Sequence, residues 1–274
     1  MAREELSDRR WEQLRPLLPP QKPRTGRPNN DHRTVLSGML WILRTGAPWR
    51  DLPPRFGAWA TVASRFYRWR KAGIWPRILE RLHQQGERAG RLDWSLHFVD
   101  GTVVRAHQHA AGAKHSTPQD EALGRSRGGF STKVHVRAER RGKPLVLVLT
   151  AGQRHEQSVF TPLMEGGAVK RPGRGRPRVR PQRVSGDKGY SSRTVRRYLR
   201  RRGIGAVLPT KKDERPRPRF DRAAYRERNV VERLINRLKA FRRVATRYEK
   251  RPPTIWRCAR WPPLSSGCEF ADTP

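Results

Sequence analysis

The run of fifteen residues from Tyr225 to Lys239 constrains this chain more than any other stretch. Read as a helix, it carries one polar stripe about 80° wide, which consists of Tyr225, Arg228, Glu232, Asn236 and Lys239. An apolar stripe with spacings of three and four lies beside it and consists of Val231, Leu234, Ile235 and Leu238. The helix therefore packs by one face and presents a fixed order of polar groups on the other. A charge run alone usually marks a solvated face, so the information lies in the spacing Y-x2-R-x3-E-x6-K.

The charge balance indicates a polyanionic partner. Lys and Arg number 61 against 24 Asp and Glu, a net charge of +37, and nucleic acid is the usual partner of such a chain. A ribosomal-type binder or a small basic structural protein is the alternative, but 35% hydrophobic residues and nine tryptophans favour a packed core. The longest apolar runs are too short for a bilayer, and the N-terminus lacks a signal-peptide core. We expect a cytoplasmic, nucleoid-associated protein with no membrane partner.

The spacing of Tyr225, Arg228, Glu232 and Lys239 resembles the signature of the DDE transposases of bacterial insertion sequences, of the IS4/IS5 type and the IS5 family in particular. In that family the glutamate is the third catalytic carboxylate, and the arginine and lysine hold DNA. The resemblance implies two catalytic aspartates elsewhere in the chain, each at the end of a strand. It also implies that Tyr225 belongs to the DNA-binding set.

Two aspartates lie in sequence contexts that fit this expectation. Residues 96–105 read as a strand that carries Asp100, because apolar residues both precede and follow the Asp-Gly pair. This Val-Asp-Gly-Thr run resembles the family's first catalytic motif. A second short strand delivers Asp187 at its carboxyl end, and Gly-Asp-Lys-Gly-Tyr at 186–190 resembles the second motif. Asp100, Asp187 and Glu232 are therefore predicted to be the catalytic and metal-binding residues.

The N-terminal third reads as short helices at 5–19, 31–44, 58–71 and 73–88. The third of these places Val62, Phe66 and Trp69 inward, and Arg65 and Arg68 outward as predicted DNA contacts. Together the helices suggest a helix-turn-helix-like DNA-binding module. The run from Trp41 to Pro53 resembles the N-terminal domain of IS5-type transposases, which implies terminal-repeat recognition. A purely structural helical cap on the catalytic domain is the alternative.

Several loop and strand cations extend the predicted DNA-binding set. Arg27 lies in a basic Gly-Arg-Pro loop that either enters a minor groove or is a solvated linker. Lys188 lies within the second aspartate motif, and Lys133 is either a DNA contact or an exposed strand lysine. Glu156 is either an accessory carboxylate or a helix-start residue that favours the helix dipole. The arginine-rich segment 167–183 is predicted to be a basic loop, disordered without DNA.

The order of expected elements predicts the fold class and the domains. Strands near 98–104, 130–138, 144–151, 182–186 and 204–209, with helices after the last three, match a ribonuclease H-like mixed sheet covered by helices, an α/β fold. We therefore divide the chain into a helical DNA-binding domain at 1–90, a catalytic domain at 91–250 and a tail at 251–274. Prolines 252, 253, 262 and 263 exclude the continuous closing helix of the family. A reading shifted by one frame permits a helical sequence there, so we interpret this tail as frameshifted.

Three carboxylates suit Mg²⁺, a hard ion that prefers oxygen ligands. Two such ions, for which Mn²⁺ can substitute, activate the attacking oxygen and stabilise the leaving oxygen of a phosphodiester displacement. The resemblance thus implies strand cleavage at the element ends, then attack of the freed 3′-OH on target DNA, with a homodimer in the DNA complex. A catalytically impaired DNA-binding remnant and a metal-dependent nuclease of the same fold are the alternative hypotheses.

Overall fold

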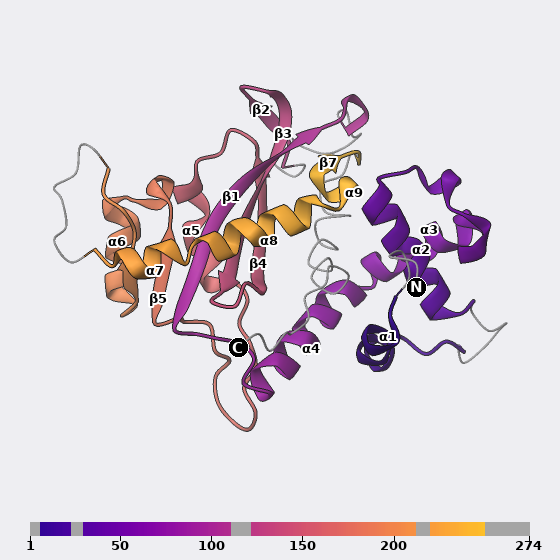
Figure 1. Ribbon diagram of the computed structural model, residues 1–274, viewed down its shortest axis with the longest axis horizontal. Helices are drawn as coiled ribbons and strands as arrows, with labels where there is room; N and C mark the ends of the chain where they lie inside the picture. Colours follow the sequence, from indigo (N-terminus) through magenta and orange to yellow (C-terminus); the bar gives the residue numbers. More distant parts are fainter. Residues whose placement is uncertain (1–5, 23–29, 111–121, 212–219, 250–274) are drawn as a thin grey trace. The chain divides into compact units, whose positions relative to one another are not determined.

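The computed structural model describes residues 6–22, 30–110, 122–211 and 220–249 (Figure 1). The predictions made for Arg27 and for the tail at 251–274 lie outside these residues. The chain forms two compact units, one from the residues up to Leu82 together with Arg237–Thr246, the other from His83–Asn236 and the segment from Arg247. These bounds differ from the predicted domains, in which residues 83–90 belong to the helical domain and residues 237–246 to the catalytic domain. No described helix is both long and apolar enough to cross a bilayer.

The first unit is helical. Its elements are α1 (Asp8–Leu14), η1 (Arg15–Leu17), α2 (His32–Thr45), η2 (Trp49–Asp51), η3 (Pro54–Phe56), α3 (Trp59–Lys71), the first part of α4 (Ile74–Arg88) and α9 (Arg242–Ala245). Asp31 is the N-cap of α2, because its side chain accepts a hydrogen bond from the Thr34 backbone N–H at 2.8 Å. The helix ends at Gly46, whose φ of 74° suits a residue without Cβ.

Arg65 of α3 does not point outward as predicted. Its side chain is buried, with the residue only 3% exposed, and it donates a hydrogen bond to the Asn30 carbonyl at 2.9 Å. Its Nη1 also lies 3.1 Å from Nδ1 of His32, whose pKa is lowered by burial and by the Arg65 charge. Arg65 therefore supports the loop before α2, because its buried guanidinium needs acceptors and finds one in that loop. Arg68 is exposed, as predicted.

The second unit is built on a mixed sheet. Its strands are β1 (Leu96–Ala106), β2 (Gly124–Ser126), β3 (Gly129–Glu139), β4 (Pro144–Ala151), β5 (Arg183–Gly186) and β6 (Gly205–Val207), and the two-residue β7 (Thr246–Arg247) completes the set. The main order is β4-β3-β1-β5-β6, in which β3 runs antiparallel to β4 and β1, and β1, β5 and β6 are parallel. This is the ribonuclease H-like arrangement, and it confirms the predicted fold class.

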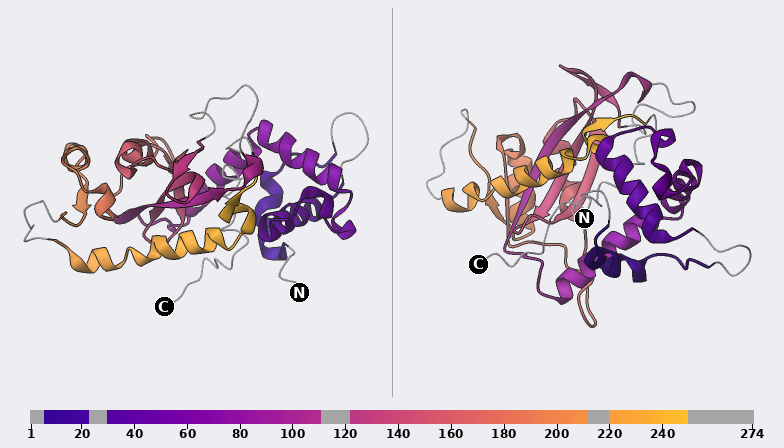
Figure 2. Two further views of the ribbon diagram at one scale, coloured as in Figure 1. Left: turned by 90° about the horizontal axis from the view of Figure 1, so that it is seen from above. Right: turned by 45° about the vertical axis from the view of Figure 1, so that its right-hand side comes forward.

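Helices cover both faces of this sheet (Figures 1 and 2). On one face α5 (Phe160–Glu165), preceded by η5 (Glu156–Val159), and α6 (Arg193–Arg201) pack in a core that includes Val99 and Val184. Because side chains alternate along a strand, Phe98 and Asp100 point to the opposite face. There α7 (Arg222–Arg226) and α8 (Asn229–Lys239) run across the strands. Short 3-10 turns η4 (Gln108–Ala110) and η6 (Lys188–Tyr190) follow β1 and β5.

The helix predicted from Tyr225 to Lys239 is interrupted. It divides into α7 and α8 at Glu227 and Arg228, where i→i+3 hydrogen bonds replace the i→i+4 pattern. The Arg228 N–H donates to the Tyr225 carbonyl at 3.0 Å, and the Val231 N–H donates to the Arg228 carbonyl at 3.0 Å. Tyr225 is therefore not on one uninterrupted stripe with Glu232, although Arg228 and Glu232 remain neighbours.

The close packing of β5 against β1 can be tested at Gly186. A Cβ on Gly186 would lie 2.8 Å from Cγ2 of Val99, closer than real Cβ contacts. Gly186→Ala should lower the free energy of unfolding by about 1–3 kcal/mol through overpacking, as measured by urea denaturation. Gly86→Ala in α4 is the control, because its Cβ would find Leu92 at an ordinary 3.4 Å and should leave stability unchanged or raise it by about 1 kcal/mol. Equal effects would refute the packing argument.

Candidate active site

Asp100 is a largely buried carboxylate in the middle of β1. Its side chain is 14% exposed, and Oδ1 accepts a hydrogen bond from the Gly101 N–H at 2.9 Å. Its Oδ2 lies 3.3 Å from Nη1 of Arg228, the residue at the α7–α8 break. Burial raises the pKa of Asp100, while the Arg228 charge opposes that rise. The carboxylate is thus held away from water with one cation beside it.

The same guanidinium also binds Glu232. Nη2 of Arg228 donates to Oε1 of Glu232, one helical turn further along α8. Burial lowers the pKa of Arg228, but the carboxylates of Asp100 and Glu232 raise it overall, so the side chain stays charged. One cation therefore spans two carboxylates that come from a central strand and from the helix crossing it.

Asp187 lies beside Asp100 because of the sheet register. β1 and β5 are parallel, and Val99 pairs with Gly186, so the two aspartates follow at equivalent positions. Oδ1 of Asp187 accepts the Gly189 N–H at 2.9 Å and so caps η6. Burial is the largest effect on the pKa of Asp100, and it raises that pKa. Arg228 and the Gly101 N–H lower it, and the charges of Asp187 and Glu232 raise it again by smaller amounts. Asp187 and Glu232 are thus each close enough to Asp100 to act on its carboxylate.

The carboxylates converge on Arg228 rather than on each other. Within the described ranges, no three His, Cys, Asp or Glu side chains are near enough to hold a metal ion as they stand. The donors are nevertheless all carboxylate oxygens, which suit a hard divalent cation, and their location already accommodates positive charge. The three carboxylates therefore fit a divalent ion by their chemistry. The Arg228 guanidinium would compete with that ion for Asp100 and Glu232.

Tyr190 lies under this cluster. It is fully buried, and its hydroxyl is 3.7 Å from the place that a Cβ on Gly101 would take. That hydroxyl has no hydrogen-bond partner among the described residues. Burial, followed by the charges of Asp100 and Asp187, raises the pKa of Tyr190 well above its usual value. The hydroxyl therefore remains a proton donor. Tyr190 is part of the second aspartate motif, but the sequence predicted no role for it.

Lys133 and Glu156 form an ion pair beside the Asp187 turn. Their side chains are 13% and 21% exposed, so Lys133 is not a free strand lysine. A Cβ on Gly189 would lie 3.3 Å from Oε2 of Glu156, which places this carboxylate next to η6. Burial raises the pKa of Glu156, but Lys133 lowers it overall, so Glu156 is ionised. Glu156 thus adds negative charge near Asp187.

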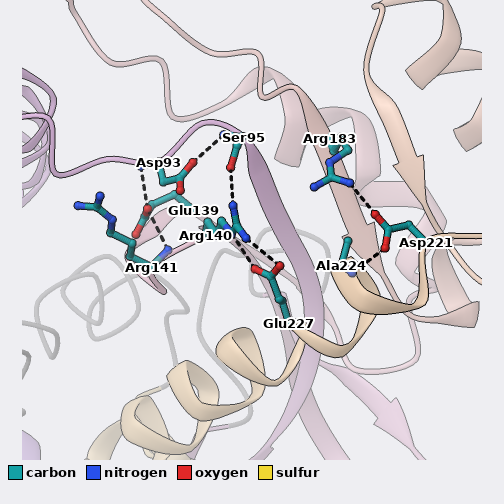
Figure 3. Close-up of polar contacts among 9 residues, drawn as sticks. All are labelled: Asp93, Ser95, Glu139, Arg140, Arg141, Arg183, Asp221, Ala224 and Glu227. Carbon is teal, nitrogen blue, oxygen red and sulfur yellow. Dashed lines mark hydrogen bonds and ion pairs between the residues drawn. The ribbon is translucent and has the colours of Figure 1, made fainter. Parts of the chain in front are cut away.

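Two ion pairs hold the segment that leads to Glu232 against the sheet (Figure 3). Nε and Nη2 of Arg140, just after β3, donate to the two carboxylate oxygens of Glu227 at 2.7 and 2.9 Å. On the other side of α7, Nη1 of Arg183 donates to Oδ2 of Asp221 at 2.7 Å, and Asp221 also caps the helix. Glu227 is drawn to Arg140 while the next residue is drawn to Asp100. These contacts explain why the helix is interrupted there.

The other predicted DNA contacts lie at separate places. Lys188 is exposed at the start of η6. Tyr225 is half-buried, with its ring centroid 5.4 Å from that of Phe220. Lys239 ends α8 and belongs to the first unit, where the exposed Arg68 also lies.

Comparison with known proteins now decides the family. Residues 95–253, which are 159 of the 274 residues, match the family described as "Transposase DDE domain". The chain is a DDE transposase. Residues 6–79 match a second family, described as "Putative transposase of IS4/5 family (DUF4096)". The predicted IS4/IS5 relationship is confirmed at the level of that whole group.

The transposase also has curated relatives. Uncharacterized protein y4sN of Sinorhizobium fredii (strain NBRC 101917 / NGR234) is 38% identical over 109 residues, 40% of this chain and 82% of the relative. The insertion element IS402 uncharacterized 16.2 kDa protein of Burkholderia cepacia is 38% identical over 112 residues, 39% of this chain and 76% of that protein. The putative transposase for insertion sequence element IS402, also from Burkholderia cepacia, is 35% identical over 120 residues, 44% of this chain and 54% of the relative.

Among solved structures, the Mos1 transposase paired-end complex with left transposon end covers 82% of each chain at 10% identity, with a TM-score of 0.24. That similarity is too weak to carry an argument. Family membership gives the transposase a metal-dependent DNA cleavage and transfer activity and a DNA partner. The sheet topology reported above, rather than the Mos1 comparison, identifies its fold.

The Arg140–Glu227 pair should position Glu232 rather than stabilise the fold. Both side chains are partly exposed, at 40% and 34%, so Glu227→Ala should lower the free energy of unfolding by at most about 1 kcal/mol. Cleavage should fall by up to about 100-fold, because small displacements of a reacting group are costly. The cleavage rate is measured under single-turnover conditions, and the free energy of unfolding is measured by urea denaturation.

The exchanged pair Arg140→Glu with Glu227→Arg should recover most of the cleavage rate, which a side chain with only a packing role would not do. Glu165→Ala removes a similar exposed pair with Arg202 and should leave cleavage unchanged. Normal cleavage by Glu227→Ala would contradict the positioning role.

Proposed function

We propose that this transposase binds the terminal inverted repeats of its element, cleaves the strands there and joins the freed 3′-OH to target DNA, with Asp100, Asp187 and Glu232 as metal-binding catalytic residues. One observation carries the assignment of the site: Arg228 binds Asp100 and Glu232 while Asp187 raises the pKa of the same Asp100. Carboxylates at such short range need a compensating cation. DNA cleavage by this family uses a divalent ion, which is that kind of cation.

We propose Mg²⁺ as this ion, in two copies, with Mn²⁺ as a substitute. Its hard-cation chemistry fits the all-oxygen donor set of Asp100, Asp187 and Glu232. When bound, such ions activate the attacking oxygen and stabilise the leaving oxygen of a phosphodiester. The Asp187 carboxylate is already oriented by the Gly189 N–H, and Asp100 by the Gly101 N–H. These two backbone contacts leave the remaining oxygen of each carboxylate for a cation.

Arg228 and Tyr190 complete the proposed machinery from the protein side. With a divalent ion held by the carboxylates, the guanidinium of Arg228 would be available to the scissile phosphate, since an arginine fork suits two phosphate oxygens. The Tyr190 hydroxyl has no hydrogen-bond partner among the described residues and lies next to Gly101. We propose that it donates a hydrogen bond to Asp100 or Asp187, the carboxylates whose charges act on it, and so fixes that side chain.

DNA contacts are proposed for residues of both units. Arg68 on α3 belongs to the helical unit, which we propose reads the terminal repeat as the DNA-binding domain. Lys188, Tyr225 and Lys133 would contact the DNA backbone near the site, Lys133 only after leaving Glu156. Lys239 would contact DNA from the helical unit. Phosphate contacts of this kind set register and affinity rather than sequence preference. We further propose a homodimer on paired ends, acting at the nucleoid in the cytoplasm.

Removal of any one of the three carboxylates should abolish catalysis and spare binding. Asp100→Asn, Asp187→Asn and Glu232→Gln should each stop cleavage of an end-bearing duplex in Mg²⁺ or Mn²⁺. DNA affinity should change little, because counterion release by Lys and Arg dominates it. Glu165→Gln, an exposed carboxylate on α5, is the control and should cleave normally. Normal cleavage by any of the three variants would remove that residue from the site.

The products of the wild-type chain distinguish the alternatives. Cleavage without strand transfer indicates a nuclease of the same fold, and DNA binding without cleavage in either ion indicates an impaired remnant. Only joined products support the proposed function in full.

Arg228→Ala should separate ion binding from DNA binding. Loss of a charge 3.3 Å from Asp100 should tighten Mn²⁺ binding about tenfold at pH 8, since one unit charge at this range contributes about 1–4 kcal/mol. The salt slope of DNA binding should fall by about one. Electron paramagnetic resonance of added Mn²⁺ and anisotropy of labelled DNA measure the two effects. Arg226→Ala, an exposed arginine on α7, is the charge-matched control, and unchanged Mn²⁺ affinity in Arg228→Ala would contradict the competition.

A further inference from the structure

A basic hairpin projects from the second unit between α5 and β5. Val169 and Arg178 form an antiparallel β-bridge and exchange two backbone hydrogen bonds, each 2.8 Å long. The eight residues 170–177 between them, Lys-Arg-Pro-Gly-Arg-Gly-Arg-Pro, are all exposed and are called the basic hairpin below. It extends as the salmon-coloured loop at the lower edge of Figure 1 and projects again in the right-hand view of Figure 2. The sequence predicts disorder here, but the base of the loop is ordered.

The base is fixed by contacts that leave the tip free. Val169 is 1% exposed within the α5–α6 core. The Arg178 guanidinium lies 4.9 Å from the ring centroid of Trp94, and its Nη1 is 3.5 Å from Oε1 of Glu87. Nη1 of Arg180 donates to the Arg202 carbonyl at 2.9 Å. The arginines at the base therefore serve as anchors, and the loop is presented from a fixed position.

The tip concentrates positive charge on a narrow backbone. None of its four cations, Lys170, Arg171, Arg174 and Arg176, has an acidic partner in the part of the chain that the structure describes. Gly175, with a φ of 136°, stands between two of the arginines in a conformation that side chains rarely adopt. Pro177 follows and restricts its own φ. Arg174 and Arg176 are thus separated by a residue that has no side chain.

We propose that the basic hairpin inserts Arg174 and Arg176 into the minor groove of DNA at A·T-rich steps. The minor groove is only about 6 Å wide, so a glycine between two arginines lets the backbone approach where bulkier residues could not. Narrow A·T tracts have an enhanced negative potential that attracts inserted arginine. A backbone-only contact would not need this Gly-Arg-Pro pattern, which recurs at Gly26–Pro28 outside the described residues. The inference rests on the proposed function, action on DNA. It adds that the basic hairpin contacts the minor groove and prefers A·T-rich sequence.

The test measures binding of the full chain to three duplexes of equal length. The first is built of A·T pairs, the second of G·C pairs and the third of inosine·C pairs. Inosine·C presents an A·T-like minor groove, because it lacks the guanine N2 amino group, but keeps a G·C-like major groove. The full chain should bind the A·T and inosine·C duplexes alike and the G·C duplex more weakly. Arg174→Ala with Arg176→Ala should bind all three equally, with a salt slope lower by about two.

Arg197→Ala with Arg200→Ala removes the same charge from exposed positions of α6 and should keep the preference for A·T and inosine·C. The inference is overturned if the full chain has no preference, if inosine·C behaves like G·C, or if the hairpin variant keeps the preference. Cleavage of an end-bearing duplex in Mn²⁺ is assayed on the same samples. Failure of the full chain to cleave would count against the proposed function and leave the groove result standing.

Discussion

The burial of the Asp100 carboxylate next to two other carboxylates is the constraint on which the site depends. Like charges at short range in a partly desolvated site are costly unless a cation compensates them. Arg228 supplies this cation by contacting both Asp100 and Glu232. In a metal-dependent DDE transposase, the same positive potential is what a divalent ion would supply. The arrangement therefore explains how the folded chain tolerates the cluster, and it is the reason we propose the cluster as the ion site.

The fold brings these groups together by simple rules of sheet geometry. Parallel pairing of β1 and β5 places Asp100 and Asp187 at equivalent positions, and side-chain alternation turns Asp100 toward α8. The helix then needs its own fixed position, which Glu227 and Asp221 provide through arginines that follow β3 and lie on β5 (Figure 3). Those arginines come from strand ends rather than from the helix itself. The third carboxylate is thus positioned by long-range ion pairs more than by its own helix.

Much of the fold follows from the sequence, because local patterns encode its helices and strands, whereas the carboxylate set was predicted from the resemblance of three short motifs to a family. Apolar residues on both sides of Asp100 predicted β1, and a short strand was predicted to end at Asp187. Interactions between distant residues could not be predicted. No local pattern shows that Arg65 is buried or that Arg140 binds a glutamate 87 residues later. The unbroken helix was predicted from periodicity alone, which carries no information about the pull of Arg140 and Asp100 on consecutive residues.

The central claim is that Asp100, Asp187 and Glu232 form one divalent-ion site, and iron-directed cleavage of the polypeptide tests it most directly. Fe²⁺ with ascorbate and peroxide generates radicals that cut the backbone next to the bound ion. The account predicts cuts near all three residues, on β1, after β5 and on α8. Excess Mg²⁺ should suppress all three cuts together. Cuts confined to one of these segments, or cuts that Mg²⁺ does not suppress, would contradict it.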